Sequence, residues 1–311
     1  MSRIFSGVQP TGDLHLGNLR TALAAAVIAR SLGEEFVIRM EDLDRVTSSL
    51  EHERHQLDDL AAIGMHSDVP VVRQSERFDR YRAAIATLSS AGLVYECYCT
   101  RREIRAEIDA AASAPHVHLP DGAYPGTCRE LSEADRQRRR ASGRLPALRL
   151  RTNGERVVVE DQVVGRFEGV VDDVVLARSD GVPAYNLAVV VDDAAQQVTH
   201  VVRGDDLLSS TPRQIYLQQL LGLPTPTYAH VPLVVGPAGD RLAKRDGAVT
   251  ARELLQRGVS AVVIRDALAR SIGCEPLGDD VEDPVAWWAS QWSMDRLPSD
   301  PWPVDRFGLA T

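Results

Sequence analysis

The sequence is poor in cysteine and in aromatic residues, and it has no long apolar run. Four cysteines in 311 residues, two of them at Cys97 and Cys99, do not form the framework of a disulfide-stabilised secreted domain. No run of about 18 apolar residues is present, so we expect no membrane partner. The N-terminus lacks a basic region followed by an apolar one. These absences predict a cytoplasmic protein with reduced thiols.

Basic residues are also fewer than acidic ones, 35 against 44, which gives a net charge of −9. This balance argues against broad nonspecific binding of nucleic acid, although a local basic patch remains compatible with it. Apolar residues make up 44% and charged residues 25% of the chain, as in globular proteins. The length corresponds to about two domains.

Hydrophobic periodicity predicts an α/β architecture at the N-terminus. Residues 3–8 and 36–40 have the pattern of strands, and the helical pattern of 14–32 between them ends at Gly33. A strand, a helix and a strand at this spacing form a βαβ unit, so we expect a parallel sheet. Two more helices are predicted, at 76–91 and at 47–63, the latter with one face formed by Leu50, Leu57, Leu60 and Ile63.

The composition changes between residues 95 and 170, which contain three of the four cysteines, and we interpret this stretch as an insertion. The α/β pattern resumes at 171, with a helix from Tyr185 to Val191, a helix at 211–221 and strands at 200–204 and 230–235. The predicted domains are therefore a catalytic domain at 1–94 and 171–248, the insertion at 95–170, and a helical C-terminal segment at 249–311. Its Trp- and Pro-rich tail is expected to pack back onto the body.

The segment Gln9–Asn18 places a glycine turn and a His-x-Gly-Asn tetrad where a strand gives way to a helix. Backbone N–H groups and the helix dipole at such a place favour an anion, and His15 is positioned to donate to a phosphate. The candidate nucleotide-binding residues here are Gly12, His15, Gly17 and Asn18. A purely structural glycine turn is the alternative.

A second candidate segment, Gly239–Gly247, is a short cationic loop that follows a strand and contains Arg241 and Lys244. It would bring positive charge to phosphates from the opposite side. An ordinary exposed hairpin is the alternative.

Together the two segments resemble the HIGH and KMSKS signatures of class I aminoacyl-tRNA synthetases. From residue 1 to about 272 the chain is most similar to the catalytic half of the glutamate family, through RMEDLD, RQSERFDRY, YNLAVVVDD, HVVRGDDLLSSTPRQ, YAHVPLVV and RLAKR. The resemblance implies a Rossmann-like catalytic domain with a zinc-bearing α+β insertion, and ATP with Mg²⁺ as a substrate. It implies catalytic roles for His15, Asn18 and Lys244.

The same resemblance implies a glutamate site. Glu41, Tyr185 and Arg203 match glutamate-binding positions of the family, as does the opening segment Phe5, Ser6, Gly7, Val8 and Gln9. A carboxylate for the ammonium group and an arginine for a carboxylate are the donor types such a site needs.

Two departures from the family stand out. Phe5 occupies the place of a family arginine that binds substrate, and we hypothesise that Arg3, two residues earlier on the same strand face, substitutes for it. In the cationic loop, Arg241 and Ala243 replace the usual lysine and serine, which predicts a reduced rate rather than lost activity.

Cys97, Cys99 and Cys128 suggest one structural zinc ion in an insertion that has little apolar core. The residues alone leave the fourth ligand open between a histidine, His116 or His118, and Tyr124. The resemblance implies Tyr124, because the short branch of the family has Cys-x-Cys followed by Tyr-x-x-x-Cys. Buried thiols without metal are the alternative, and Cys274 is expected to be an isolated, half-buried thiol.

The short branch of the family attaches glutamate to queuosine in the anticodon of tRNA(Asp). Val189, the segment 207–222 and the expected lack of an anticodon-binding domain favour this branch. The implied partners are L-glutamate, ATP and queuosine-containing tRNA(Asp), with a monomer as the default state. The rivals are a truncated enzyme that charges the 3′ end of tRNA, a nucleotidyltransferase, and a degenerate tRNA- or nucleotide-binding protein. One candidate tRNA surface is a set of arginines that could instead form a solvated helix face: Arg136, Arg138, Arg139, Arg140, Arg144, Arg149 and Arg151.

Overall fold

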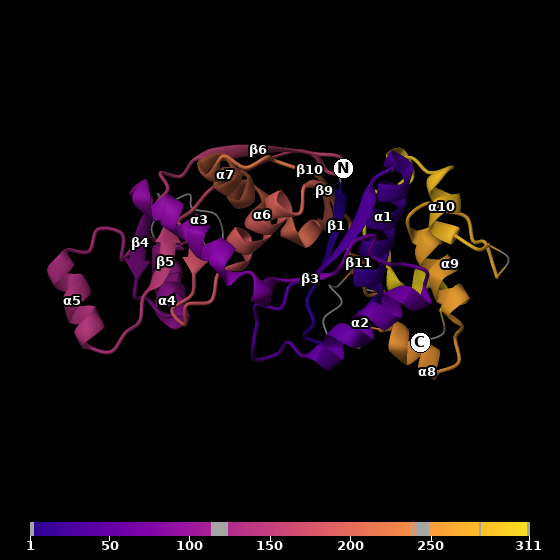
Figure 1. Ribbon diagram of the computed structural model, residues 1–311, viewed down its shortest axis with the longest axis horizontal. Coiled ribbons are helices and arrows are strands. Elements are labelled where there is room, and N and C mark those ends of the chain that lie inside the picture. Colours follow the sequence, from indigo (N-terminus) through magenta and orange to yellow (C-terminus); the bar gives the residue numbers. More distant parts are fainter. Residues whose placement is uncertain (1–2, 113–123, 238, 240–248, 280, 310–311) are drawn as a thin grey trace.

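The computed structural model describes residues 3–112, 124–237, 239, 249–279 and 281–309 (Figure 1). Its largest sheet has seven strands in the order β3-β2-β1-β9-β10-β6-β7. All neighbouring strands are parallel except β6 and β7, which form an antiparallel hairpin at one edge. The strands are β1 (Arg3–Val8), β2 (Glu35–Met40), β3 (Val72–Arg73), β6 (Arg156–Asp161), β7 (Gly165–Val170), β9 (Val198–Gly204) and β10 (Thr227–Val231).

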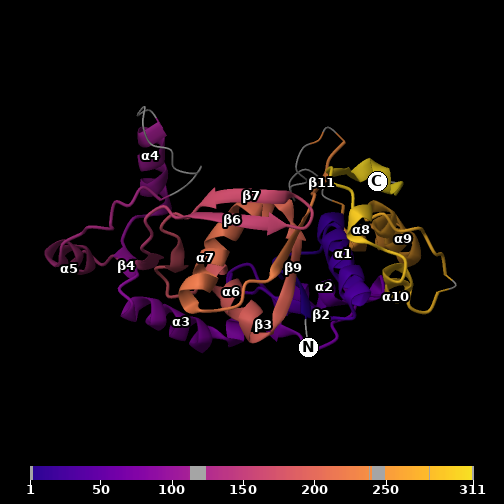
Figure 2. The ribbon, with the colours of Figure 1, turned by 90° about the horizontal axis from the view of Figure 1, so that it is seen from above.

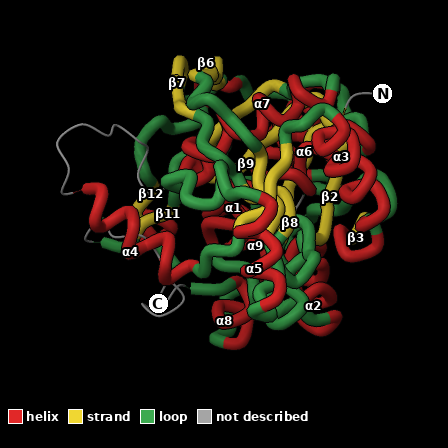
Figure 3. The backbone as a smooth tube through the Cα atoms, turned by 90° about the vertical axis from the view of Figure 1, so that its left-hand side faces the viewer, coloured by secondary structure: helices red, strands yellow, loops and turns green. Residues whose placement is uncertain are grey.

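Helices cover both faces of this sheet (Figures 1 and 3). One face carries α1 (Leu16–Leu32), α9 (Ala261–Ser271) and α10 (Pro284–Ala289), and the other carries α3 (Phe78–Ser90), α6 (Tyr185–Ala195) and α7 (Thr211–Leu221). Alternate residues of β1 serve the two faces, since Ile4 and Val8 pack in the core around α1 whereas Phe5 packs in the core against α7. The predicted parallel α/β domain is confirmed.

A second sheet lies at one end of the molecule, seen from above in Figure 2. It contains the antiparallel strands β4 (Val94–Cys97), β5 (Ala147–Leu150) and β8 (Val175–Ala177), with α4 (Arg101–Ala112) and α5 (Glu133–Ala141) nearby. These assignments differ from the boundaries expected at 95 and 170. β6 and β7, which were expected in the insertion, extend the main sheet, whereas β8, which was expected in the main domain, pairs with β5 of the insertion. The periodicity of a segment does not specify which distant strand it pairs with, so these boundaries could not be predicted from it.

Capping explains where the two N-terminal helices begin. The side chain of His15 accepts from the Asn18 amide, so α1 starts at Leu16, and Gly33 ends it with φ 67°. α2 (Leu50–Ala62) starts three residues later than predicted because Ser49 accepts from the His52 amide. Of the four residues predicted to form one face, Leu57, Leu60 and Ile63 pack in the core around α1, whereas Leu50, at the start of the helix, is 76% exposed.

The predicted strand at 230–235 is two strands. β10 ends at Val231, and β11 (Val234–Val235) pairs in a separate sheet with β12 (Trp302–Pro303). Short 3₁₀ helices cover Gln74–Glu76, Asp205–Ser210, Met294–Arg296 and Val304–Phe307.

The C-terminal segment packs on the body, as predicted. It comprises α8 (Ala251–Gln256), α9 and α10, and α10 lies beside α1 (Figure 1). Trp288 and Trp292 are buried, and their indole N–H groups donate to the carbonyl oxygens of Glu275 and Ile272, both at 2.8 Å. Among the described residues, no helix combines the length and apolarity needed to cross a membrane.

Candidate functional site

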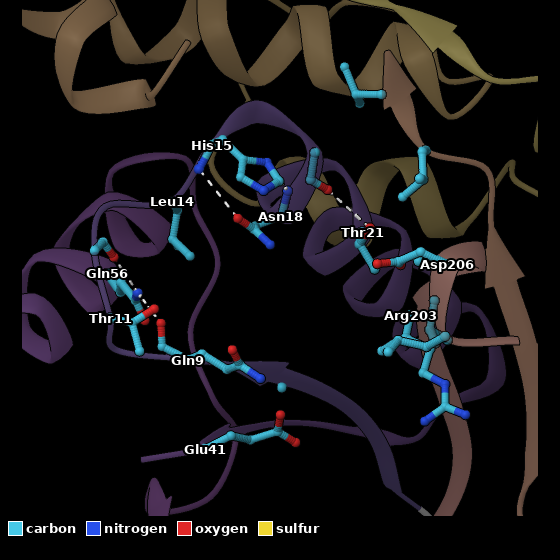
Figure 4. Close-up of a pocket in the computed structure, with 18 of the residues that line it drawn as sticks. Gln9, Thr11, Leu14, His15, Asn18, Thr21, Glu41, Gln56, Arg203 and Asp206 are labelled. Carbon is cyan, nitrogen blue, oxygen red and sulfur yellow. Dashed lines mark hydrogen bonds between the residues drawn. The ribbon is translucent and has the colours of Figure 1, made fainter. Parts of the chain in front are cut away.

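The turn between β1 and α1 is fixed by hydrogen bonds from one buried side-chain amide. Nε2 of Gln56, on α2, donates to the carbonyl oxygens of Gln9 at 2.7 Å and Gly12 at 2.6 Å (Figure 4). Gln56 is 1% exposed, so these bonds are shielded from water. The predicted glycine turn is therefore fixed in one conformation by a residue that the sequence analysis did not single out.

The His-x-Gly-Asn tetrad forms a capping box at the start of α1. Nδ1 of His15 accepts from the Asn18 amide at 3.2 Å, and the His15 amide donates to Oδ1 of Asn18 at 3.3 Å. Because Nδ1 accepts a hydrogen bond, a neutral imidazole carries its proton on Nε2. His15 thus presents a donor at the positive end of the helix, which is the chemistry predicted for it.

The tetrad opens into a cavity of about 440 Å³. His15, Gly17 and Asn18 line it beside Gly12, and Figure 4 shows Glu41 and Arg203 at the far end from His15. The fold thus brings together residues that are far apart in the sequence and that were predicted for two adjoining subsites. The predicted residues that line this cavity are Phe5, Gly7, Gln9, Gly12, His15, Gly17, Asn18, Glu41, Tyr185 and Arg203.

Within the predicted glutamate-binding segment, Phe5 to Gln9, the structure places Phe5, Gly7 and Gln9 in the lining of the cavity. Val8 is buried in the core around α1 and does not line the cavity. The side chain of Ser6 lies outside the described part of the chain.

Both ends of the predicted cationic loop adjoin the tetrad. Pro232, Leu233 and Val234 line the cavity before the loop. After it, the Val249 carbonyl accepts from the Leu16 amide at 3.2 Å, next to an antiparallel bridge between Thr250 and His15. Arg241, Ala243 and Lys244 themselves lie outside the described residues.

Glu41 follows β2 and is packed among charged and aromatic groups. Its Oε1 is 3.5 Å from Nη2 of Arg39, which also donates through Nη1 to Oδ1 of Asp193 at 2.9 Å. Burial, opposed by the charge of Arg39, raises the pKa of Glu41 to about 7. A β-carbon on Gly7 would lie 2.7 Å from Oε1 of Glu41 and 2.6 Å from Cζ of Phe5, so any larger residue at position 7 would displace these side chains from their present positions.

Arg3 does not take the place of the missing family arginine. Its Nε donates to Oε2 of Glu35 at 2.8 Å and its Nη1 to the Gln196 carbonyl at 2.9 Å, at the start of β1. It does not line the cavity. The hypothesis overlooked that partners at the amino end of the sheet hold this side chain there.

The cysteine cluster has the spacing of a tetrahedral metal site. The sulfur atoms of Cys97, Cys99 and Cys128 lie within 4.8 Å of one another, without a disulfide bond, and the Tyr124 hydroxyl is 3.4 Å from Sγ of Cys97 and 3.6 Å from Sγ of Cys99. Zn–S bonds of about 2.3 Å in a tetrahedron separate two sulfur atoms by about 3.8 Å. The Tyr98 amide donates to Sγ of Cys128 at 3.4 Å.

These four side chains therefore fit a zinc ion. His116 and His118, the other predicted candidates for the fourth ligand, lie outside the described residues. Cys274 is buried by itself, more deeply than expected.

A second cavity, of about 920 Å³, adjoins the first one. Gln9, Thr11, Glu41 and Tyr185 line both cavities, and Cys99, Thr100 and Arg101 of the insertion line only the second. The space next to Glu41 is therefore bounded by the main sheet on one side and by the insertion on the other.

Asp13, His52 and His55 form another group of possible ligands, within 4.8 Å of one another. Nε of Arg252 is 3.9 Å from Oδ1 of Asp13 and so supplies positive charge at this point. We therefore assign no metal site to this group.

The predicted arginine surface is largely neutralised by neighbouring carboxylates. Arg149 is buried and donates to the Asp173 carbonyl at 2.7 Å, with its guanidinium 3.8 Å from the centre of the Tyr124 ring. Ion pairs with acidic side chains hold Arg136, Arg138, Arg140, Arg144 and Arg151. Such pairs favour the alternative of a solvated helix face.

Sequence reasoning missed several polar residues that shape the site. Arg39 is fully buried beside Glu41, and His230, which is also fully buried, contacts Arg203. Both lie inside segments that were quoted for the resemblance, RMEDLD and YAHVPLVV. A polar residue within an otherwise apolar strand is the signal that could have identified them.

Comparisons with known proteins identify the family of this chain. Residues 8–278 match the model of the family described as tRNA synthetases class I (E and Q), catalytic domain. The chain is 56% identical over 300 residues to a glutamyl-Q tRNA(Asp) synthetase of Nocardia farcinica, covering 96% of this chain and 92% of that protein. It is 44% identical over 308 residues to one of Symbiobacterium thermophilum, with 94% and 92% covered.

Longer proteins also match. Glutamate–tRNA ligase 1 of Alkalilimnicola ehrlichii is 41% identical over 266 residues, which are 84% of this chain and 54% of the ligase. A crystal structure of a glutamate tRNA ligase from Elizabethkingia meningosepticum, in complex with its amino acid, superimposes with a TM-score of 0.80 at 25% identity. It covers 98% of this chain and 68% of the ligase.

Proposed function

This chain belongs to the family of class I tRNA synthetases for glutamate and glutamine, and we propose that it activates glutamate with ATP and transfers it to queuosine in tRNA(Asp). One observation carries the proposal: Glu41, Tyr185 and Arg203 line the same cavity as the His15–Asn18 tetrad. A nucleotide and an amino acid with two carboxylates and an ammonium group would meet there.

In the first step, an oxygen of the glutamate α-carboxylate attacks the α-phosphorus of ATP. A new P–O bond forms, the bond between the α-phosphorus and the bridging oxygen to the β-phosphorus breaks, and pyrophosphate leaves. Mg²⁺ bound to the ATP would offset the charge of the phosphates. His15, through Nε2–H, Asn18 and Lys244 are the proposed donors to the phosphates, and Gly12, Gly17 and Arg241 the further ATP contacts. Glu41 would receive the ammonium group, and Tyr185 and Arg203 a carboxylate.

In the second step, a hydroxyl of the queuosine cyclopentenediol attacks the activated carbonyl carbon. The new ester bond forms as the bond between the carbonyl carbon and the phosphate oxygen breaks, and the adenylate phosphate takes the hydroxyl proton as AMP leaves. The second cavity supports an entry route for the nucleoside, because it reaches Glu41 and Tyr185 from the side of the insertion. The insertion would thus bind the acceptor nucleoside. Zinc bound to Cys97, Cys99, Tyr124 and Cys128 would stabilise the insertion itself.

The names of the relatives support transfer to queuosine over charging of the 3′ end. The proteins that this chain matches over 92% of their length are glutamyl-Q tRNA(Asp) synthetases.

Two assays test the proposal. The first is glutamate-dependent ATP–pyrophosphate exchange without tRNA, which we expect to proceed and which a degenerate binding protein would not support. The second is transfer of labelled glutamate to tRNA(Asp) with queuosine, tRNA(Asp) without it, and tRNA(Glu). We expect label only on tRNA(Asp) with queuosine, and we expect this labelling to persist when the 3′-terminal adenosine of the tRNA is removed. Label that requires this adenosine would instead identify an enzyme that charges the 3′ end.

A further inference from the structure

Three buried polar side chains, Asp161, His230 and Arg203, form a hydrogen-bonded series that ends at the cavity beside Arg203. Oδ2 of Asp161 is 2.6 Å from Nδ1 of His230, and Nε2 of His230 is 3.1 Å from Nε of Arg203. The side chains of Asp161 and His230 are 0% exposed. The three residues come from β6, β10 and β9, which are neighbouring strands, so the sheet itself sets their alignment.

Hydrogen-bond chemistry fixes the proton positions along this series. Nε of Arg203 is only a donor, so Nε2 of His230 has to accept, and the imidazole proton lies on Nδ1 and is donated to Asp161. The carboxylate is held in turn, because Oδ1 of Asp161 accepts from the amides of Val163 at 3.0 Å and Val164 at 2.9 Å. Nε2 of His230 also lies 3.1 Å from Oγ1 of Thr211, whose hydroxyl can donate to it, so the tautomer with the proton on Nδ1 suits all of these contacts.

The second side of the guanidinium is fixed as well. Nη2 of Arg203 donates to Oγ1 of Thr211 at 2.8 Å. Among the described residues, Nη1 makes no hydrogen bond, and Arg203 lines the cavity. Two of the three nitrogen atoms are thus committed to positioning, and the third is left for a ligand.

We infer that His230, oriented by Asp161, is a positioning residue that holds the Arg203 guanidinium in place for a carboxylate of the amino acid. The inference rests on the proposed function for the identity of that carboxylate. Arginine has several rotatable bonds, and fixing it before the ligand arrives removes part of the entropy cost of binding.

The charges around His230 are consistent with a neutral imidazole. Burial lowers the pKa of His230 and the charge of Arg203 acts in the same direction, although Asp161 and Asp205 oppose it. A second proton would place an N–H on Nε2, facing the N–H of Arg203. That arrangement would push the guanidinium out of its position.

Packing alone does not account for this histidine. Its ring is stacked with that of Tyr228, with the centroids 6.0 Å and the planes 14° apart, and an aliphatic residue would also fill this space. A buried histidine and carboxylate are unfavourable unless each makes its hydrogen bonds. The polar pair is accounted for by what it contacts, which is Arg203.

The test compares substitutions of His230 and Asp161 by glutamate-dependent ATP–pyrophosphate exchange. His230→Ala removes the acceptor for Nε of Arg203, and we expect the KM for glutamate to rise about 10- to 100-fold, as for the loss of a hydrogen bond to a charged group. The KM for ATP should stay within about twofold. His230→Gln offers an amide oxygen to the same N–H and should restore part of the loss.

Asp161→Asn tests the proton assignment without changing size. Its single carbonyl oxygen cannot accept from both His230 and the amides of Val163 and Val164. If the amide NH₂ group faces the ring, the proton moves to Nε2 and opposes Arg203. We expect the KM for glutamate to rise here as well. Tyr228→Phe is the control, because it removes only the hydroxyl that accepts from Gln218 and keeps the ring.

A double-mutant cycle with Arg203→Lys separates positioning from folding. If His230 acts through Arg203, His230→Ala adds little to the KM for glutamate once Arg203 is replaced. Additive effects would overturn the inference, and so would an unchanged KM in folded His230→Ala, with folding checked by thermal melting. A wild-type chain that shows no exchange with glutamate would instead contradict the proposed function itself.

Discussion

The guanidinium carbon of Arg39 lies 3.8 Å from the centre of the Phe5 ring. The Phe5 ring therefore carries a cation on its face. Arg39 is fully buried and makes ion pairs with Glu41 and Asp193. The positive charge next to Glu41 therefore comes from β2 and not from β1.

We predict that glutamate activation depends on pH through Glu41. Burial raises the pKa of Glu41 to about 7, so below that pH the carboxyl is protonated and cannot pair with an ammonium group. In exchange assays, kcat/KM for glutamate should rise about tenfold per pH unit up to about pH 7 and then level off. Glu41→Gln should lower kcat/KM and remove the step. A wild-type profile that is flat between pH 5.5 and 7.5 would contradict this role.

His15→Asn separates the two roles of His15. Asparagine is a good N-cap, so α1 should keep its stability to within about 0.5 kcal/mol. The Nε2 donor is lost, and we expect exchange to slow about 10²- to 10³-fold. Ser49→Ala is the converse control, because it removes the cap of α2 and should cost about 1 kcal/mol with little effect on exchange. Equal losses of stability in His15→Asn and Ser49→Ala would contradict the separation of the capping role of His15 from its role as a phosphate donor.

The cysteine cluster predicts one zinc ion per chain by elemental analysis. Cys128→Ser should abolish binding, because it replaces a thiolate with an aliphatic hydroxyl, which is far less acidic than a thiol or a phenol and stays protonated near neutral pH. Tyr124→Phe should leave three ligands and weaken affinity. Cys274→Ser is the control, since Cys274 lies outside the cluster. Zinc content that stays at one per chain in Cys128→Ser would exclude the site.

The C-terminal segment should contribute to the stability of the main domain. Trp288 is 1% exposed and packs in the core that contains α1, whereas Trp287 on the same helix is 37% exposed. We expect Trp288→Ala to lower the free energy of unfolding by about 3–5 kcal/mol and Trp287→Ala by much less. Denaturant unfolding of the two variants measures the difference, and comparable losses would show that α10 does not depend on this contact.

Much of the fold could be predicted because it is local. The period of 3–8, 14–32 and 36–40 specified β1, α1 and β2, and the end of α1 at Gly33 followed from glycine's access to positive φ. Pairing across the sheet could not be predicted in this way. β6 was expected in the insertion and lies in the main sheet, whereas β8 was expected in the main domain and lies in the sheet of the insertion. Local composition does not distinguish the two sheets for such short strands.

The candidate site divides along the same line. The chemical types and their order along the chain could be derived from the sequence: a glycine turn with His15 and Asn18, an acid at Glu41, an arginine at Arg203 and three clustered thiols. Which cation accompanies Glu41, and which groups hold Arg203, depended on how the strands pair in the folded protein. The physical reason is that a hydrogen bond requires two atoms within about 3 Å, and partners such as Asp161, His230 and Arg203 meet at that distance only after distant strands have paired.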